Sequence, residues 1–519
     1  MKTKLSFGEL ISVSSMLFGL FFGAGNLIFP VFLGQAAGRN FWPALAGFLI
    51  TGVGLPLLAV TALGLSGSSG ILDLSQKVNP RFGRIFTCAL YLTIGPFFAC
   101  PRCITVPFET GVRQILPAGV NNRLALFVFS LIFYLLILWF SLRPGEILTV
   151  IGKVLNPVFI CILAVLIFAA LTNFSGNIRA FDPDPLYESG AFTRGMLDGY
   201  NTMDTLAGFA FGIIIIDVIR NLGVKDRSAI AGNTVRAGVF SCTFMGIIYV
   251  LTALTGAASR SFSPMRSNGG LILAGLASRF FPKGGALLLA VIVFLACLKT
   301  IIGLITSCAE GFASLFPRSP GYRFWAVIFC TITFVIANFG LDTILAFSLP
   351  VLTLLYPAAI TLTILALTGN LEQSPQADFD SSIPSLLRGA QRTKGARAES
   401  RKRSSYLRAA HPAEGCGIGI AEQFPIPQKN AGQLPLVVVM TSLICSLPDL
   451  ILALPKVWKP MAAPYRLCLL LAKKIPLFSS GFGWVVPTLF IYLCGLLIRR
   501  MKKGYRKRTS NASSPFESR

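Results

Sequence analysis

Charged residues and histidine are scarce in this sequence, and both shortages exclude classes of protein. Only 13% of the 519 residues are charged, against roughly 25% in ordinary soluble domains. His411 is the single histidine and lies in a polar stretch, which excludes histidine-based metal sites and Ser-His-Asp triads within apolar segments. The sequence also lacks a carboxylate pair, a Cys-His pair and a phosphate-binding loop, so we predict that the protein is not an enzyme and has no catalytic residue.

The cysteines form no recognisable site. There are twelve, mostly within apolar runs, where a free cysteine behaves as a small hydrophobic residue. The one Cys-x-x-Cys motif, Cys100–Cys103, has neither a second pair to complete a zinc site nor the βαβ context of a redox motif. We therefore expect packing cysteines and no bound cofactor.

Much of the formal net charge of +25 lies in two basic stretches, Arg388–Arg408 and Arg499–Arg508. In a soluble protein such a charge would indicate nucleic-acid binding. Here both stretches flank apolar runs, which is typical of cytoplasmic segments that contact anionic lipid. We expect membrane lipid as a partner, no nucleic acid and no obligate protein partner.

Hydrophobic residues make up 54% of the chain and form runs long enough to cross a bilayer, which takes about 20 residues per helix. We predict an all-α integral membrane protein that crosses a bacterial inner membrane about twelve times, with both termini in the cytoplasm. The expected organisation is a core at 1–369, a polar basic loop at 370–433 whose composition indicates disorder, two spans within 434–498 and a basic tail at 499–519. The predicted spans are 9–33, 43–65, 83–106, 124–142, 150–172, 195–217, 234–258, 284–312, 323–338, 341–368, 434–454 and 482–498.

The first and sixth runs are interrupted by residues that break helices. Gly23 to Asn26 interrupt the first run, and small and polar residues at 199–208 interrupt the sixth. In hydrocarbon an unpaired backbone group costs several kcal/mol, so a break persists only where protein shields it or where it lines a cavity. Interruptions at the first position of two successive five-span halves are typical of secondary transporters with inverted repeats. The pair therefore predicts two inverted five-helix repeats plus two extra helices, with a transport site at the breaks.

Ionisable residues within apolar runs are candidates for function, because their burial in a membrane is costly. For Arg102, Glu109 and Asp217 the alternative is a side chain that reaches the membrane surface. Asp204 is a stronger candidate, because an unwound segment needs polar neighbours. The eighth run adds Lys299 and Glu310.

The eighth run also carries hydroxyl groups that suit a cation. Thr300 and Ser307 are seven positions apart and share one helical face, and Thr306 adjoins them. Hard cations prefer oxygen ligands, and carbonyls freed by a broken helix supply more of them. The alternative is that these hydroxyls bond back to their own helix.

Several motifs in chain order resemble the branched-chain amino acid:cation symporter family, the bacterial carriers for leucine, isoleucine and valine. They are Phe22–Pro30, Gly47–Pro56, Gly95–Arg102, Gly199–Leu206, 296–310 and 350–357. The resemblance implies ten core helices in two inverted repeats plus two more, and import of a branched-chain amino acid together with sodium.

The first run also looks like that of the neurotransmitter-sodium symporters, which share a Gly-x-Gly-Asn break. By that similarity Ala24 and Gly25 contact the substrate and Asn26 binds sodium. The carbonyls of Gly19 and Phe22, with Thr306 and Ser307, would form a second sodium site, and Thr300 is a further candidate ligand. We expect Phe97, Phe98, Thr202 and Asp204 to complete the substrate pocket.

Two features depart from the family. Lys299 stands where the family has a neutral residue, often threonine, so a lysine could replace the ion, and a sodium-independent carrier (proton-coupled or an exchanger) is the alternative function. The segment at 371–433 is far longer than the family's connection and is either a genuine loop or a locally altered reading frame. A channel or a membrane enzyme is disfavoured, because the sequence lacks pore-lining rings and catalytic clusters.

Overall fold

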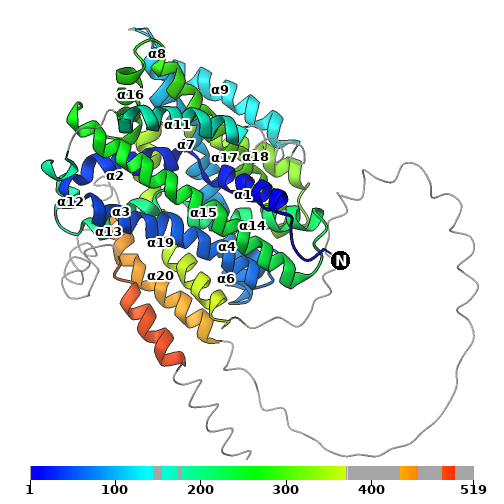
Figure 1. The fold of residues 1–519 in the computed structure, drawn as a ribbon. Coiled ribbons are helices and arrows are strands. Elements are labelled where there is room, and N and C mark those ends of the chain that lie inside the picture. The colour runs from blue at the N-terminus through cyan, green and yellow to red at the C-terminus, as the bar shows by residue number, and fades with distance from the viewer. Residues whose placement is uncertain are drawn as a thin grey trace, which may run out of the picture. The chain divides into compact units, whose positions relative to one another are not determined.

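The computed structural model describes residues 2–117, 119–143, 155–172, 177–369, 371, 433–453 and 482–496. The named elements in these ranges are all helices, which confirms the predicted all-α class (Figure 1). Seven helical stretches among them are long and apolar enough to cross a membrane, or eight if the pair Tyr322–Ala337 and Leu341–Ser348, bent by 110°, is one broken span. Shorter apolar helices accompany them, so the total of about twelve spans stays a prediction. The loop at 370–433 and the tail at 499–519 lie outside the described residues, apart from Leu371 and Gln433.

The first predicted run consists of two helices. Helix α1 (Phe7–Phe21) is followed by its capping residue Phe22, and Gly23 caps the start of α2 (Ala24–Ala37). The sixth run is divided in the same way into α13 (Ala191–Tyr200) and α14 (Asp204–Asn221), with three residues between them. Both predicted breaks are therefore present.

A third break was not predicted. The run expected at 83–106 is divided into α6 (Pro80–Leu92), a π-helical turn η3 (Thr93–Phe97) and α7 (Ala99–Pro107). Gly95 adopts a non-helical conformation (φ −89°, ψ −118°) directly before Pro96. Proline has no N–H to continue a helix and disfavours helical geometry in the residue before it, which explains the bend.

The remaining runs correspond to single helices or to helices joined by short turns. Helix α16 (Gly269–Phe280) was not predicted, because its 12 residues fall short of a bilayer span. The other elements in chain order are η1 (Gly38–Asn40), α3 (Phe41–Leu49), η2 (Ile50–Gly54), α4 (Leu55–Leu65), α5 (Ile71–Gln76), η4 (Phe108–Val112), α8 (Arg113–Ile115), α9 (Asn122–Ser141), α11 (Asn156–Thr172), η6 (Ile178–Ala180), α12 (Pro185–Glu188), α15 (Arg227–Ala258), η7 (Ser259–Ser261), α17 (Gly285–Leu315), α18 (Tyr322–Ala337), α19 (Leu341–Leu367) and α20 (Gln433–Ala453).

Several pairs of helices cross with their backbones in contact at glycines, and we call two of these contacts the glycine crossings. Where α2 meets α15, a Cβ on Gly34 would lie 1.9 Å from the main-chain oxygen of Ala253, and one on Gly256 would lie 2.0 Å from that of Val31. Small residues allow such close approach in membrane helix pairs. The second glycine crossing joins α3 and α13 through Gly47 and Gly195, which face the main-chain oxygens of Phe192 and Ala44.

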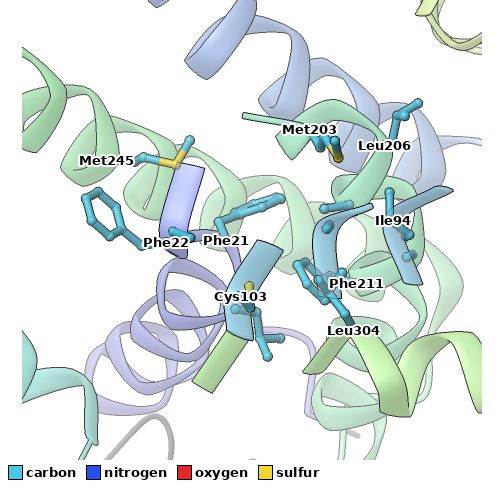
Figure 2. Packing of buried hydrophobic residues seen from close by; sticks show 14 of the residues in the cluster. Phe21, Phe22, Ile94, Cys103, Met203, Leu206, Phe211, Met245 and Leu304 are labelled. Carbon is cyan, nitrogen blue, oxygen red and sulfur yellow. The ribbon is translucent and has the colours of Figure 1, made fainter. Parts of the chain in front are cut away.

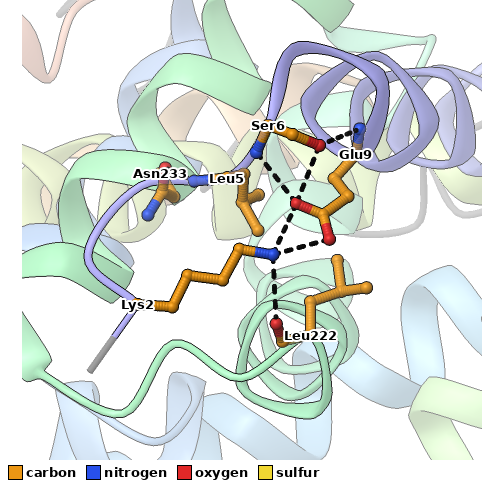
Figure 3. Close-up of polar contacts among 6 residues, drawn as sticks. All are labelled: Lys2, Leu5, Ser6, Glu9, Leu222 and Asn233. Carbon is orange, nitrogen blue, oxygen red and sulfur yellow. Dashed lines mark hydrogen bonds and ion pairs between the residues drawn. The ribbon is translucent and has the colours of Figure 1, made fainter.

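Hydrogen bonds attach the start of α1 to the ends of α14 and α15 (Figure 3). A capping box begins the helix, in which Ser6 N donates to Glu9 Oε2 at 2.8 Å and Glu9 N donates to Ser6 Oγ at 3.3 Å. Lys2 Nζ donates to Glu9 at 2.6 Å and to the Leu222 carbonyl at 3.4 Å. Leu5 N donates to Asn233 Oδ1 at 3.3 Å. These bonds hold the start of the helix that precedes the first break against the end of α14 and the start of α15.

Candidate functional site

A small buried cavity lies between the two predicted breaks. Its volume is about 20 Å³, which is enough for one water molecule and far too little for an amino acid, so any larger ligand requires its walls to move. Helices α1, α2, η3, α7, α14 and α17 form the cavity together with residues of both breaks. Its lining residues are Leu20, Phe21, Gly23, Ala24, Gly25, Asn26, Ile94, Ala99, Arg102, Cys103, Thr202, Met203, Asp204, Ala207, Phe211, Thr300 and Leu304.

A triad of buried polar side chains joins the two breaks. Asn26 Nδ2 donates to Asp204 Oδ2 at 2.7 Å and also to the hydroxyl of Tyr249. The Tyr249 hydroxyl donates to the same carboxylate oxygen at 2.7 Å. Hydrogen bonds to a buried carboxylate offset its loss of water. The first residues of α2 and α14 are thereby held together across the cavity.

Side chains also bind the backbone groups that each break leaves unpaired. At the first break Asn26 Oδ1 accepts a hydrogen bond from Gly23 N at 2.9 Å. At the second, Thr202 Oγ1 donates to the Gly199 carbonyl at 2.8 Å. Met203 has φ 64°, the one positive φ of a non-glycine residue among the described residues. Such backbone strain persists where surrounding structure imposes it, as it commonly does at functional sites.

An arginine from α7 reaches the same cavity. Arg102 is 3% exposed, and its Nη1 donates to the Asn201 carbonyl in the second break at 2.9 Å. Its guanidinium carbon lies 5.4 Å from the centre of the Phe29 ring on α2. A Cβ on Gly25 would lie 2.8 Å from Arg102 Nη2, so the guanidinium packs directly on the first break. Arg102 therefore contacts both breaks.

Other lining residues of the cavity are apolar. Figure 2 shows Phe21, Ile94, Phe211 and Leu304, which come from α1, η3, α14 and α17. The rings of Phe21 and Phe211 meet edge to face, with centroids 5.7 Å apart. A cavity that combines a few convergent polar groups with apolar side chains is typical of a site for a small amphipathic molecule.

The structure brings most of the predicted substrate residues together. Ala24, Gly25, Thr202 and Asp204 all line the cavity. Phe97 and Phe98 do not line it, and Phe97 is 39% exposed. The bend at Gly95 and Pro96 turns the chain here, so that Ile94 and Ala99 line the cavity in place of the two phenylalanines. The role of each of these residues in binding stays a prediction.

The predicted sodium ligands fall into two groups. Asn26 and Thr300 line the cavity, and Thr300 packs on Gly23. Gly303 packs on Leu20, so α17 runs antiparallel to α1, and Thr306 and Ser307 lie about 9 Å or more further along α17 than Thr300. Thr306 Oγ1 lies 3.5 Å from the Tyr322 hydroxyl. Gly19 and Phe22 are buried on α1 and at its end, and the second sodium site stays a prediction.

Lys299 lies beside the predicted sodium ligands and is fully buried. Its Nζ donates to Asn156 Oδ1 on α11 at 2.9 Å, and Asn156 Nδ2 donates in turn to the Ser15 carbonyl at 2.8 Å. The ammonium lies 4.0 Å from the ring centre of Phe159, with the rings of Phe18 and Phe22 at 5.2 and 5.7 Å. Aromatic faces attract cations, so this cage stabilises a buried positive charge.

Two of the polar residues at the site could not be selected from the sequence. Tyr249 lies in an unbroken helix without a local motif, yet it completes the triad. Tyr356 falls within the motif at 350–357, which indicated no individual role for it, and it donates to the Tyr200 carbonyl at 2.8 Å. Arg102 did carry a signal, since it is a charge within an apolar run. Its alternative, a side chain that reaches the membrane surface, is wrong, because Arg102 is buried against both breaks.

Comparison with known proteins identifies the family. Residues 7–390 match the family described as branched-chain amino acid transport protein. The chain belongs to this family. A branched-chain amino acid permease from Lactobacillus delbrueckii subsp. lactis is 53% identical over 379 residues, which cover 73% of this chain and 85% of the permease. A permease from Bacillus subtilis is 40% identical over 70% of this chain and 82% of its own length. A carrier from Pseudomonas aeruginosa is 39% identical over 75% and 87%.

The branched-chain amino acid transport family thus accounts for the motifs seen in the sequence. Its relatives are named permeases and carriers, which agrees with the prediction of a transporter that is not an enzyme. The family match ends at residue 390, early in the segment whose length departs from the family.

Solved structures with little sequence identity share the fold. Mhp1, a nucleobase-cation-symport-1 family transporter in a closed conformation with bromovinylhydantoin bound, has a TM-score of 0.54 at 12% identity over 92% of this chain and 96% of its own. A manganese transporter variant from Eremococcus coleocola has a TM-score of 0.52 at 12% identity over 96% and 97%. This similarity confirms the all-helical inverted-repeat class with broken first and sixth helices.

Proposed function

We propose that this protein carries leucine, isoleucine and valine across the bacterial inner membrane by alternating access, with both termini in the cytoplasm. The observation that carries the proposal is the hydrogen bond between Asn26 and Asp204, which places both helix breaks on one buried cavity. Broken helices that meet within the membrane are where secondary transporters hold their substrates. The names of the relatives supply the substrate class.

The cavity walls suit the parts of an aliphatic amino acid. The Asp204 carboxylate accepts hydrogen bonds from an ammonium group, while the start of α2 at Ala24 carries the partial positive charge of a helix N-terminus. The wall of Phe21, Ile94, Phe211 and Leu304 receives the aliphatic side chain. An apolar wall separates substrates that differ by one methylene by about 1–3 kcal/mol, so the three branched-chain amino acids should compete.

We further propose sodium as the coupling ion, bound by oxygens at the first break. Asn26 Oδ1 accepts one hydrogen bond, from Gly23 N, and retains a second lone pair. Thr300 Oγ1 lines the same cavity and has no hydrogen-bond partner among the described residues. Hard cations take such neutral oxygens together with carbonyls at a helix break.

A second candidate is a sodium-independent carrier, favoured by the environment of Lys299. Lys299 directly precedes Thr300 in the sequence, and its ammonium donates to the neutral Asn156 within an aromatic cage. The fixed positive charge of Lys299 would replace the charge of a bound sodium ion. The carrier would then be proton-coupled or an exchanger.

Leucine uptake by reconstituted proteoliposomes tests the proposal. We expect uptake of radiolabelled leucine that rises with an inward sodium gradient, competes with excess valine and is lost in Asn26→Ala. Uptake that is indifferent to both Asn26→Ala and valine would contradict the function itself. Full uptake without sodium that is lost in Lys299→Thr would instead select the second candidate.

A further inference from the structure

Arg102 is a buried cation that forms no direct ion pair among the described residues. The described residues form five ion pairs within 4.0 Å, and none includes Arg102. The carboxylate that shares its cavity, Asp204, accepts hydrogen bonds through Oδ2 from Asn26 and Tyr249. A buried charge without a partner is strongly unfavourable. Arg102 is therefore in an environment that a ligand of opposite charge would complete.

The guanidinium of Arg102, a lining residue of the cavity, also has an unpartnered donor. Nη1 donates to the Asn201 carbonyl, whereas Nε is buried and has no hydrogen-bond partner among the described residues. Buried polar atoms are nearly always hydrogen-bonded, so an unpartnered one at a cavity points to a group that binds there. The hydroxyl of Thr300, another lining residue, is also buried and has no hydrogen-bond partner among the described residues.

We infer that Arg102 binds the carboxylate of the transported amino acid while Asp204 binds its ammonium group. This inference rests on the proposed function and names the group that selects α-amino acids at that site. A free amino acid is a zwitterion, and a cavity with one arginine and one aspartate matches it with opposite charges. The planar guanidinium suits a carboxylate better than lysine does, because its N–H groups form a fork that takes both oxygens.

The position of Arg102 explains the absence of a side chain at Gly25. With a Cβ on Gly25 at 2.8 Å from Nη2, the guanidinium would be displaced from the first break, where the partial positive charge of α2 adds to its own. Arg102 and the start of α2 thus form one positive end of the cavity. The apolar residues on the other walls remain for the aliphatic side chain.

A purely structural role for Arg102 makes a different prediction. Its bond to Asn201 and its contact with Phe29 hold both breaks in place, and loss of these contacts would weaken the binding of every ligand alike. A direct role weakens only ligands that carry a carboxylate. Leucine and leucinamide separate the two roles, because they differ in that group and share the ammonium group and side chain.

The test is equilibrium binding of leucine and leucinamide to the purified full-length protein and its variants. We expect the wild-type protein to bind leucine at least tenfold more tightly than leucinamide. Arg102→Gln should weaken leucine binding tenfold or more and change leucinamide binding less than threefold. Arg102→Lys keeps the charge without the fork and should fall between the two. Arg194→Gln is the matched control, since Arg194 pairs with Asp198 at 3.0 Å and does not line the cavity.

Three outcomes would overturn the inference: unchanged leucine binding in Arg102→Gln, an equal loss for both ligands, or a leucine preference that Arg194→Gln reduces as much. If Arg102→Gln does not fold, the same comparison with Arg102→Lys decides. Failure of the proposed function is recognised separately, because the wild-type protein would then bind none of the three branched-chain amino acids. Any other amino acid that it binds, compared with its amide, would still test Arg102.

Discussion

Asn26 Nδ2 lies 2.7 Å from Asp204 Oδ2, although the two residues are 178 positions apart. Each lies in the first turn of the helix that resumes after a break, in α2 and α14. The contact therefore joins corresponding positions of the two halves of the protein. A buried carboxylate depends on such hydrogen bonds. A substitution at either residue should therefore alter the structure of both breaks.

Removing the charge of Asp204 tests its role as the ammonium partner. Asp204→Asn keeps the size of the side chain and an oxygen for Asn26, so the fold should persist. Hydrogen bonds to charged groups contribute about 1.5–3 kcal/mol, and leucine uptake into proteoliposomes should fall at least tenfold. Asp342→Asn, an exposed site at the start of α19, is the control. Unchanged uptake in Asp204→Asn would contradict the role.

Adding one methyl group at Gly25 should impair binding without unfolding the protein. In Gly25→Ala the new Cβ would lie 2.8 Å from Arg102 Nη2 and 3.4 Å from Phe29, and the end of the arginine side chain would have to move. We expect weaker leucine binding and a nearly unchanged melting temperature. Gly275→Ala on α16 meets no atom within 4 Å and should leave both values unchanged. An equal effect of the two substitutions would refute the link to Arg102.

The glycine crossings should be intolerant of any side chain. In Gly256→Ala the Cβ would lie 2.0 Å from the main-chain oxygen of Val31, so the backbones would have to separate. Overpacking typically costs about 1–3 kcal/mol, and we expect a lower melting temperature in detergent. Gly232→Ala on the same helix has nothing within 4 Å and should be neutral or stabilising, since alanine favours helix. Similar melting of the two variants would contradict the packing argument.

Lys299 and Asn156 should depend on one another for stability. Asn156→Leu leaves the buried Lys299 amine without its hydrogen-bond partner, and a hydrogen bond to a charged group contributes about 1.5–3 kcal/mol. The double variant Lys299→Met with Asn156→Leu replaces both polar groups by apolar ones and should recover much of the melting temperature. The double-mutant cycle measures the coupling. Additive losses would mean that the 2.9 Å contact does not stabilise the fold.

The sequence predicts the breaks better than the contacts between them. Glycines and polar residues in an apolar run indicate a break at Gly23 and at 199–208, because local backbone chemistry decides it. The bend at Gly95 was missed, although Pro96 is a local signal, because residues 83–106 were interpreted as one continuous span. Helix α16 was missed because the expected span length excludes a 12-residue helix.

Residues contributed from unbroken helices could not be selected from the sequence. Tyr249 is one tyrosine in the 32-residue helix α15, and only the crossing of α15 with α2 brings it to Asp204. The same holds for Asn156, which meets Lys299 across 143 positions. Their roles depend on how helices distant in the sequence pack together, and the residues next to them in the sequence do not predict that packing.

The glycine crossings determine which parts of this carrier can move. Backbones in direct contact at Gly34 with Gly256, and at Gly47 with Gly195, cannot slide past one another without a clash. Helices α2 and α15, like α3 and α13, are therefore expected to turn as rigid pairs. The breaks at 22–23 and 201–203 then act as hinges, and opening of the site to either side of the membrane would proceed as rotation of these pairs against the rest of the bundle.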